Sequence, residues 1–241
     1  MTFHFNPDKK YCISVDEIER LRNNNILRND YVNNVKETIA NQLEKILMPK
    51  SGIIDGDNLK GLIFPTEGWN FDVFISHSHN NVVQAKKLAA YLSREKNRTP
   101  FLDDFIWGSA DNLLREIDEK FCMHSTGKSF NYNKRNFSTS HVHTMLSMAI
   151  FEMIARCKTF IFIESNDSLD FNALKDENRR TLSPWLYQEL QYARMLSIMT
   201  KRIINESRMF SIGGQLKISY GVDLDDFKKL TASSLRTIVE L

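Results

Sequence analysis

The spacing of apolar residues predicts two kinds of segment, which alternate from residue 71 onward. Short runs rich in aromatic and β-branched residues predict buried strands at residues 71–76, 99–103 and 159–163. Weaker patterns predict strands at residues 203–204 and 216–220. Longer segments with helical spacing predict helices at residues 80–96, 110–122, 140–156, 183–199 and 224–240. Alternating strands and helices indicate an α/β fold in which a parallel sheet has helices on both faces.

The first 68 residues show a different pattern, which predicts a small helical segment ahead of the sheet. Ser14 begins a capping-box sequence, so a helix is expected to start there. Apolar residues at helical spacing predict a second helix at residues 29–47. Prolines and glycines then indicate an irregular connector at residues 49–68. We therefore expect a helical N-terminal extension at residues 1–68 and an α/β domain at residues 69–241.

Polar segments and a helix start mark the expected ligand-binding edge. Residues 124–138 are a predicted polar loop of unusual length, and residues 165–182 form another polar stretch. Ser183 followed by Pro184 is a strong start signal for the next helix. In open parallel sheets, ligands bind beyond the carboxyl ends of the strands, where the strand order reverses. A flavodoxin-like order places that reversal between the strands at residues 71–76 and 159–163.

Composition and charge narrow the possible classes of function. The chain has 32 Lys and Arg against 30 Asp and Glu, so it lacks the basic excess typical of nucleic-acid-binding proteins. Its start has no apolar signal core, and its apolar runs are too short to span a bilayer. The three cysteines are widely spaced, which favours free thiols in a reducing compartment. We expect a cytoplasmic protein that binds neither nucleic acid nor membrane.

Three motifs, in the expected order, resemble the TIR (Toll/interleukin-1 receptor) domain family. The strand at residues 71–76, followed by His77-Ser78-His79, resembles the first TIR strand and its loop. Residues 101–108 resemble the second strand and the start of the BB loop. Residues 183–190 resemble the Ser…Trp-x-x-x-Glu-Leu signature of enzymatic TIR domains. Together the motifs cover about residues 69–220.

The resemblance implies a flavodoxin-like fold and, for Trp-x-x-x-Glu members, NAD glycohydrolase or ADP-ribosyl cyclase activity. The chain resembles stand-alone bacterial TIR proteins of antiphage systems such as Thoeris. In those systems the TIR enzyme makes a signal from NAD, and the signal activates a separate effector protein. The resemblance also implies self-association, since enzymatic TIR domains commonly need two protomers to complete the pocket. NAD is then the substrate, no further cofactor is expected, and the product is linear, cyclic or conjugated ADP-ribose.

The motifs also supply candidate site residues. Trp185 and Glu189 are four residues apart on a predicted helix, so they share a face at its edge. Nicotinamide leaves NAD as a neutral molecule, so the general acid that most glycosidases need is not required. One carboxylate that holds the ribose and stabilises its positive charge is enough, and we expect Glu189 to be the catalytic residue. The expected substrate-binding residues are Ser76, His77, Ser78, Asp103, Trp107 and Trp185.

Two other motifs suggest a metal site and nucleotide hydrolysis, but neither motif is complete. The pairs His77/His79 and His141/His143 suggest zinc, but neither has a carboxylate or cysteine at a recognisable spacing, so no metal site is expected. The run at residues 127–129 imitates the end of a P-loop. The upstream glycine of that motif is missing, which excludes nucleoside-triphosphate hydrolysis.

Two competing functions stay open beside the enzyme. One is a non-catalytic TIR scaffold that acts through TIR–TIR contacts at the BB loop, residues 104–112. The other is a virulence TIR that interferes with host signalling. The Trp185–Glu189 pair favours the enzyme over the scaffold, because TIR adaptors often lack the acid.

Overall fold

The computed structural model describes residues 4–21, 47, 53–63, 71–102, 111, 113–170, 179–202, 220–221 and 224–237. The chain divides into two compact units. The first unit comprises Met1–Leu27, Asn70–Leu102 and Met153–Leu241. The second comprises Arg28–Trp69 and Asp103–Glu152.

The first unit is built on a five-stranded, all-parallel sheet with the order β3-β2-β4-β1-β7. β2 (Val73–Ser76), β3 (Pro100–Leu102) and β4 (Thr159–Glu164) confirm three strands expected from their apolar runs. β1 (Lys10–Ser14) and β7 (Lys228–Leu230) complete the sheet. The expected α/β class with a flavodoxin-like parallel sheet is confirmed.

β1 corrects the prediction that residues 1–68 form a helical segment outside the sheet. Lys10–Ser14 pairs in parallel with β4 on one side and with β7 on the other. Its first residue is a fully buried lysine, which forms an ion pair with Asp226 and lies over the ring of Phe227. A lysine at a buried position obscures the strand pattern, and its ion partner is 216 residues away along the chain. The sheet of the first unit therefore includes a strand, Lys10–Ser14, from the segment expected to be helical.

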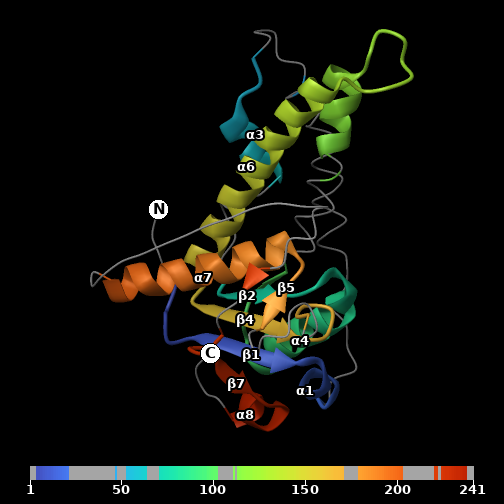
Figure 1. Ribbon diagram of the computed structural model, residues 1–241. Helices are drawn as coiled ribbons and strands as arrows, with labels where there is room; N and C mark the ends of the chain where they lie inside the picture. The colour runs from blue at the N-terminus through green and yellow to red at the C-terminus, as the bar shows by residue number, and fades with distance from the viewer. Residues whose placement is uncertain are drawn as a thin grey trace. The chain divides into compact units, whose positions relative to one another are not determined.

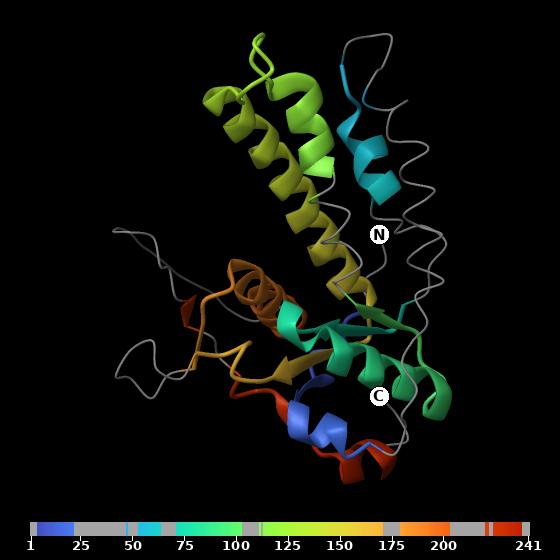
Figure 2. The ribbon, with the colours of Figure 1, turned by 90° about the vertical axis from the view of Figure 1, so that its right-hand side faces the viewer.

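Helices lie on both faces of this sheet (Figures 1 and 2). α7 (Pro184–Arg202) covers one face, whereas α1 (Val15–Glu19), α4 (Val82–Glu95) and α8 (Ala232–Thr237) lie on the other. The Ser183 hydroxyl accepts a hydrogen bond of 3.2 Å from the backbone of Leu186, which confirms the predicted start of α7. Within the described part of the chain, no helix is both long and apolar enough to cross a membrane.

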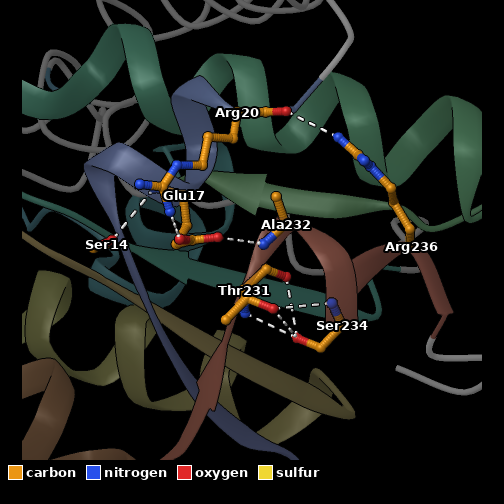
Figure 3. Close-up of polar contacts among 7 residues, drawn as sticks. All are labelled: Ser14, Glu17, Arg20, Thr231, Ala232, Ser234 and Arg236. Carbon is orange, nitrogen blue, oxygen red and sulfur yellow. Dashed lines mark hydrogen bonds and ion pairs between the residues drawn. The ribbon is translucent and has the colours of Figure 1, made fainter.

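Polar contacts fasten α1 to α8 (Figure 3). The Ser14 hydroxyl accepts the backbone N–H of Glu17 at 3.3 Å, so the predicted cap of α1 is confirmed. The Glu17 carboxylate accepts the N–H of Ala232 at 2.7 Å, at the start of α8. The guanidinium of Arg236 donates to the carbonyl of Arg20 at 2.9 Å. These bonds tie the first helix of the chain to the last described one.

The C-terminal strands differ from the prediction. β7 lies inside the segment expected to be a closing helix at residues 224–240, and α8 is the helical part of that segment among the described residues. Lysines at two of the three β7 positions are typical of an edge strand and hide the strand pattern. β5 (Arg180–Thr181) pairs antiparallel with β6 (Tyr220–Gly221). The strand expected at residues 203–204, and most of that at 216–220, lie outside the described residues.

Side-chain caps in the second unit start two helices where the sequence predicted loops. α3 (Gly56–Ile63) lies within the expected connector at residues 49–68. The Asp55 carboxylate caps it by accepting the N–H groups of Asp57 and Asn58 at 3.0 and 3.1 Å. α6 (Tyr132–Arg156) begins inside the expected loop at residues 124–138, because the Asn131 side chain accepts the N–H of Lys134 at 3.1 Å. Asp and Asn serve turns and helix caps equally well, which explains both errors.

Two other predicted helices concern this unit. The helix expected at residues 110–122 is present at residues 113–117 and continues as the π-helical segment η2 (Asp118–Cys122). The helix expected at residues 29–47 lies outside the described residues except for Leu47.

Candidate functional site

The sheet face under α7 is aromatic in its middle. The rings of Phe74 and Phe160 stack with their centroids 5.5 Å apart, and Phe101 extends the group on the β3 side. Alternate side chains of a strand share a face, and partners in register on parallel strands point the same way. Toward the carboxyl ends of the strands this face carries Phe162 together with the polar or charged residues Ser76 on β2, Glu164 on β4, and Cys12 and Ser14 on β1.

A short hydrogen bond links this face to α7. The Ser76 hydroxyl donates to Oε2 of Glu189 at 2.6 Å. Ser76 is the last residue of β2, and Glu189 lies in the second turn of α7, 113 residues later. Both residues are fully buried. The structure thus brings together two residues that separate sequence motifs had assigned to one site.

Glu189 lies deeper than expected. The sequence placed Trp185 and Glu189 together at the edge of the helix. Glu189 has 0 % exposure, whereas Trp185 is half-buried, so the expectation that Glu189 lies at the edge is wrong. α7 is rotated so that Glu189 faces the sheet with Leu186 and Leu190, which are also buried. Burying a carboxylate is unfavourable unless it is hydrogen-bonded, and the Ser76 hydroxyl supplies one such bond.

The loop after β2 holds two more of the predicted residues. His77 is buried, and its Nδ1 lies 3.5 Å from the carbonyl oxygen of Ile75. Ser78 is half-buried at the start of the 3-10 turn η1 (His79–Asn81), which leads into α4. Both residues follow Ser76 directly at the carboxyl end of the sheet. The predicted residues Asp103 and Trp107, and all but Asp111 of the BB loop at residues 104–112, lie outside the described residues.

A second cluster of polar groups lies on the same face, and no sequence pattern indicated it. Glu164 accepts hydrogen bonds from the ammonium of Lys229 and, at 3.1 Å, from the thiol of Cys12. Arg179 lies 3.3 Å from its other carboxylate oxygen. Lys229 also donates to the Cys12 sulfur at 3.1 Å. The cluster depends on β1 and β7, which are the two strands of the parallel sheet that sequence analysis missed.

Burial and pairing shift the pKa values in this cluster. Burial raises the pKa of Glu164, but hydrogen bonds from Lys229 and Cys12 and the nearby positive charges outweigh burial and hold it below its ordinary value. Burial, with Glu164 beside it, raises the pKa of the Cys12 thiol, although the hydrogen bond with Lys229 opposes the shift. Burial lowers the pKa of Lys229, yet its bonds to Glu164 and Cys12 raise it overall. Glu164 is therefore a carboxylate at neutral pH, and Cys12 is a protonated thiol.

The histidine pairs do not assemble a recognisable metal centre in the described part of the chain. Over these residues, no group of three or more His, Cys, Asp and Glu side chains is placed to hold a metal ion. His77 and His79 belong to the first unit, and His141 and His143 to the second.

The Ser76–Glu189 pair lies where this class of fold binds ligands. β2 and β4 are neighbours; the chain leaves β2 toward β3 and leaves β4 toward the opposite side of the sheet, so the order reverses between them. A buried carboxylate at this point can hold a hydroxyl group or stabilise a developing positive charge. No family model, curated protein or solved structure matches the chain.

Proposed function

We propose that the protein cleaves NAD at the bond between nicotinamide and ribose, with Glu189 as the catalytic residue. The observation that carries this proposal is the 2.6 Å hydrogen bond from Ser76 to Glu189 at the reversal of strand order. It supports the reaction because it joins two TIR-like motifs around one buried carboxylate. The Trp185–Glu189 spacing on α7 adds to this support.

The chemistry needs one carboxylate. The bond between C1′ of the ribose and the pyridinium nitrogen breaks, and its electron pair goes to the nitrogen, so nicotinamide leaves as a neutral molecule. Positive charge then develops on the ribose, and the Glu189 carboxylate stabilises it. Electrostatic stabilisation of this kind is strongest where water is excluded, as it is around a buried side chain. Water or another nucleophile adds to C1′ and loses a proton, which yields linear, cyclic or conjugated ADP-ribose.

Neighbouring residues position the substrate in this proposal. Ser76 orients the carboxylate, and a ribose hydroxyl takes its place as hydrogen-bond donor when NAD binds. Trp185 lies one turn before Glu189 and is half-buried, so its ring offers a surface for the ligand to pack against. His77 and Ser78 follow Ser76 at the same edge of the sheet and contact the ribose or phosphates. The proposal extends to self-association and to a separate effector protein that responds to the product in antiphage defence.

Nicotinamide release from NAD tests the proposal. The assay uses the purified full chain, alone and with a phage lysate or a crowding agent, and chromatography measures free nicotinamide. Glu189→Gln preserves side-chain size and removes the charge, so release should fall by about 100- to 1,000-fold. Glu95→Gln, at an exposed position of α4, is the matched control and should release nicotinamide like the wild type.

Two results would contradict the proposal. One is the absence of release by the wild type under every condition. The other is release by Glu189→Gln at the wild-type rate, with circular dichroism showing both proteins folded. Either result would favour the non-catalytic scaffold. If release occurs and depends on Glu189, mass spectrometry of the product distinguishes linear, cyclic and conjugated ADP-ribose.

A further inference from the structure

A polar cavity of about 410 Å³ opens at the carboxyl ends of β1 and β4. Its walls come from the start of α1, the η1 turn and the loop that follows β4. The lining residues include Asp16, Asn81, Glu164, Ser165 and Asp167. All of them belong to the first unit.

The hydrogen bonds around Asn81 fix the orientation of its amide. The Ser165 hydroxyl accepts the backbone N–H groups of Asp167 and Ser168, each at 3.1 Å. The hydroxyl therefore keeps its single proton to donate, and it donates to Oδ1 of Asn81, which lies 2.6 Å from the hydroxyl oxygen. The oxygen of the Asn81 amide is thus assigned to Ser165, and the nitrogen, Nδ2, is left as a donor.

Asn81 is a buried group that still has hydrogen-bonding capacity. Its residue exposure is 5 %, and it lines the cavity. Among the described residues, its Nδ2 donates to no acceptor. Nδ2 is not among the fully buried unpaired atoms of the described residues, so it is accessible, and on a residue that lines the cavity it can donate to an acceptor atom of a ligand.

The other polar groups of the cavity restrict the ligand class. Asp16 and Asp167 line it and are both exposed to solvent, and Oδ1 of Asp167 accepts a hydrogen bond of 3.1 Å from Nδ2 of Asn80. Asp16 and Asp167 accept hydrogen bonds and repel anions, which argues against a phosphate. A vicinal diol fits, since each hydroxyl can donate to a carboxylate while one of them accepts from Asn81. In dinucleotide-binding α/β folds, an acidic residue near the sheet edge binds ribose hydroxyls in this way.

The cavity lies within reach of the same dinucleotide as Glu189. Ser76 pairs with Phe162, and Glu164 on the cavity wall lies two residues further along β4. Glu164 therefore lies about 7 Å further along the strand direction, and about 5 Å across to the neighbouring strand, from Ser76. NAD contains two riboses joined by a pyrophosphate, so one ribose can lie at Glu189 while the other enters the cavity.

We propose that this cavity binds the adenosine ribose of the dinucleotide, with Asn81 and Asp16 contacting its 2′- and 3′-hydroxyls. The inference rests on the proposed function, since it names the second half of the same substrate. Asn81 donates to one hydroxyl, and both hydroxyls donate to the carboxylates. The diol therefore makes the contacts that select a ribonucleotide over a deoxynucleotide.

Calorimetric titration with ADP and with 2′,3′-dideoxy-ADP tests the inference directly. Neither ligand has a nicotinamide bond to break, so the experiment does not depend on turnover. EDTA is present so that a divalent cation cannot mediate binding. The wild type should bind ADP about ten-fold more tightly than the dideoxy analogue, because the diol contributes at least one net hydrogen bond.

Two variants and a matched control sharpen the test. Asn81→Ser removes the amide donor, and Asp16→Asn removes the acceptor charge. Each should weaken ADP binding by about ten-fold and leave the dideoxy analogue unaffected, so the discrimination disappears. Asp57→Asn, an exposed aspartate in α3 of the second unit, should bind both ligands like the wild type.

The outcomes separate this inference from the proposed function. Equal binding of ADP and its dideoxy analogue by the wild type would overturn the inference, as would variants that keep the discrimination. If NAD is cleaved but the diol is not recognised, the inference alone fails. If the diol is recognised but NAD is not cleaved, the ribose site stands and the proposed function fails.

Discussion

Two carboxylates lie on the same side of the sheet but have different surroundings. Glu164, at the end of β4, is half-buried and contacts an ammonium, a guanidinium and a thiol. Glu189, on α7 above the end of β2, is fully buried and receives a hydroxyl hydrogen bond from Ser76. One site joins Glu164 to Lys229 on β7, to the Cys12 thiol on β1 and to Arg179, and the other brings a helix carboxylate to a strand-end hydroxyl.

The different surroundings of Glu164 and Glu189 fit different roles for the two carboxylates. The cations around Glu164 hold it ionised and tie β4 to β1 and β7, so a ligand would have to break ion pairs to use it. The hydroxyl on Glu189 can be replaced by a substrate hydroxyl without separating those charges. A carboxylate with an exchangeable neutral partner suits chemistry, and one held by cations suits structural support.

The largest effect on stability should come from the buried pair. Ser76→Ala removes the hydroxyl from a carboxylate that has no exposure, so the free energy of unfolding should fall by about 1–3 kcal/mol. Urea unfolding measures the change. Ser140→Ala, an exposed position on α6, is the matched control and should change stability by less than about 0.5 kcal/mol. Equal effects of the two substitutions would contradict the account.

Alkaline pH should weaken the Glu164 cluster through Cys12. The folded state raises the pKa of this thiol, so above about pH 8.5 the unfolded chain loses a proton that the folded chain keeps. Stability should then fall by up to about 1.4 kcal/mol per pH unit, until the folded pKa is reached. Fully buried Cys157, whose pKa burial also raises, adds a loss of the same sign. Urea unfolding across this range should give a shallower slope for Cys12→Ala, and an unchanged slope would count against the assignment.

The smallest effect should come from the ion pairs themselves. The Lys229 and Arg179 side chains are 58 % and 37 % exposed, so solvent screens their attraction to Glu164. Glu164→Gln should therefore cost less than about 1 kcal/mol at neutral pH. The folded pKa of Glu164 is lowered, so its contribution is present above the unfolded pKa of about 4.3 and is lost as the pH falls through the folded value. Unfolding free energies of variant and wild type should converge in acid; a gap that persists there would refute the ion-pair origin.

The comparison also explains which part of the molecule was predictable. Ser76 and Glu189 each belong to a local pattern, a buried strand end and a capped helix, and local patterns survive in sequence. The Glu164 cluster needs β1 and β7, where lysines stand in strand positions because partners distant in sequence accommodate them. Helical spacing placed Trp185 and Glu189 on one face but could not give the rotation of α7, which packing against the sheet decides. Glu189 is consequently more buried than expected.

The most direct test of the central claim is kcat for nicotinamide release at saturating NAD, measured for the wild type, Glu189→Gln and Glu164→Gln in parallel. If Glu189 performs the chemistry, its substitution lowers kcat by about 100- to 1,000-fold. Substitution of Glu164, which anchors strands, then lowers kcat by less than about ten-fold. Equal losses in the two folded variants, or the larger loss at Glu164, would contradict the assignment of Glu189 as the catalytic residue.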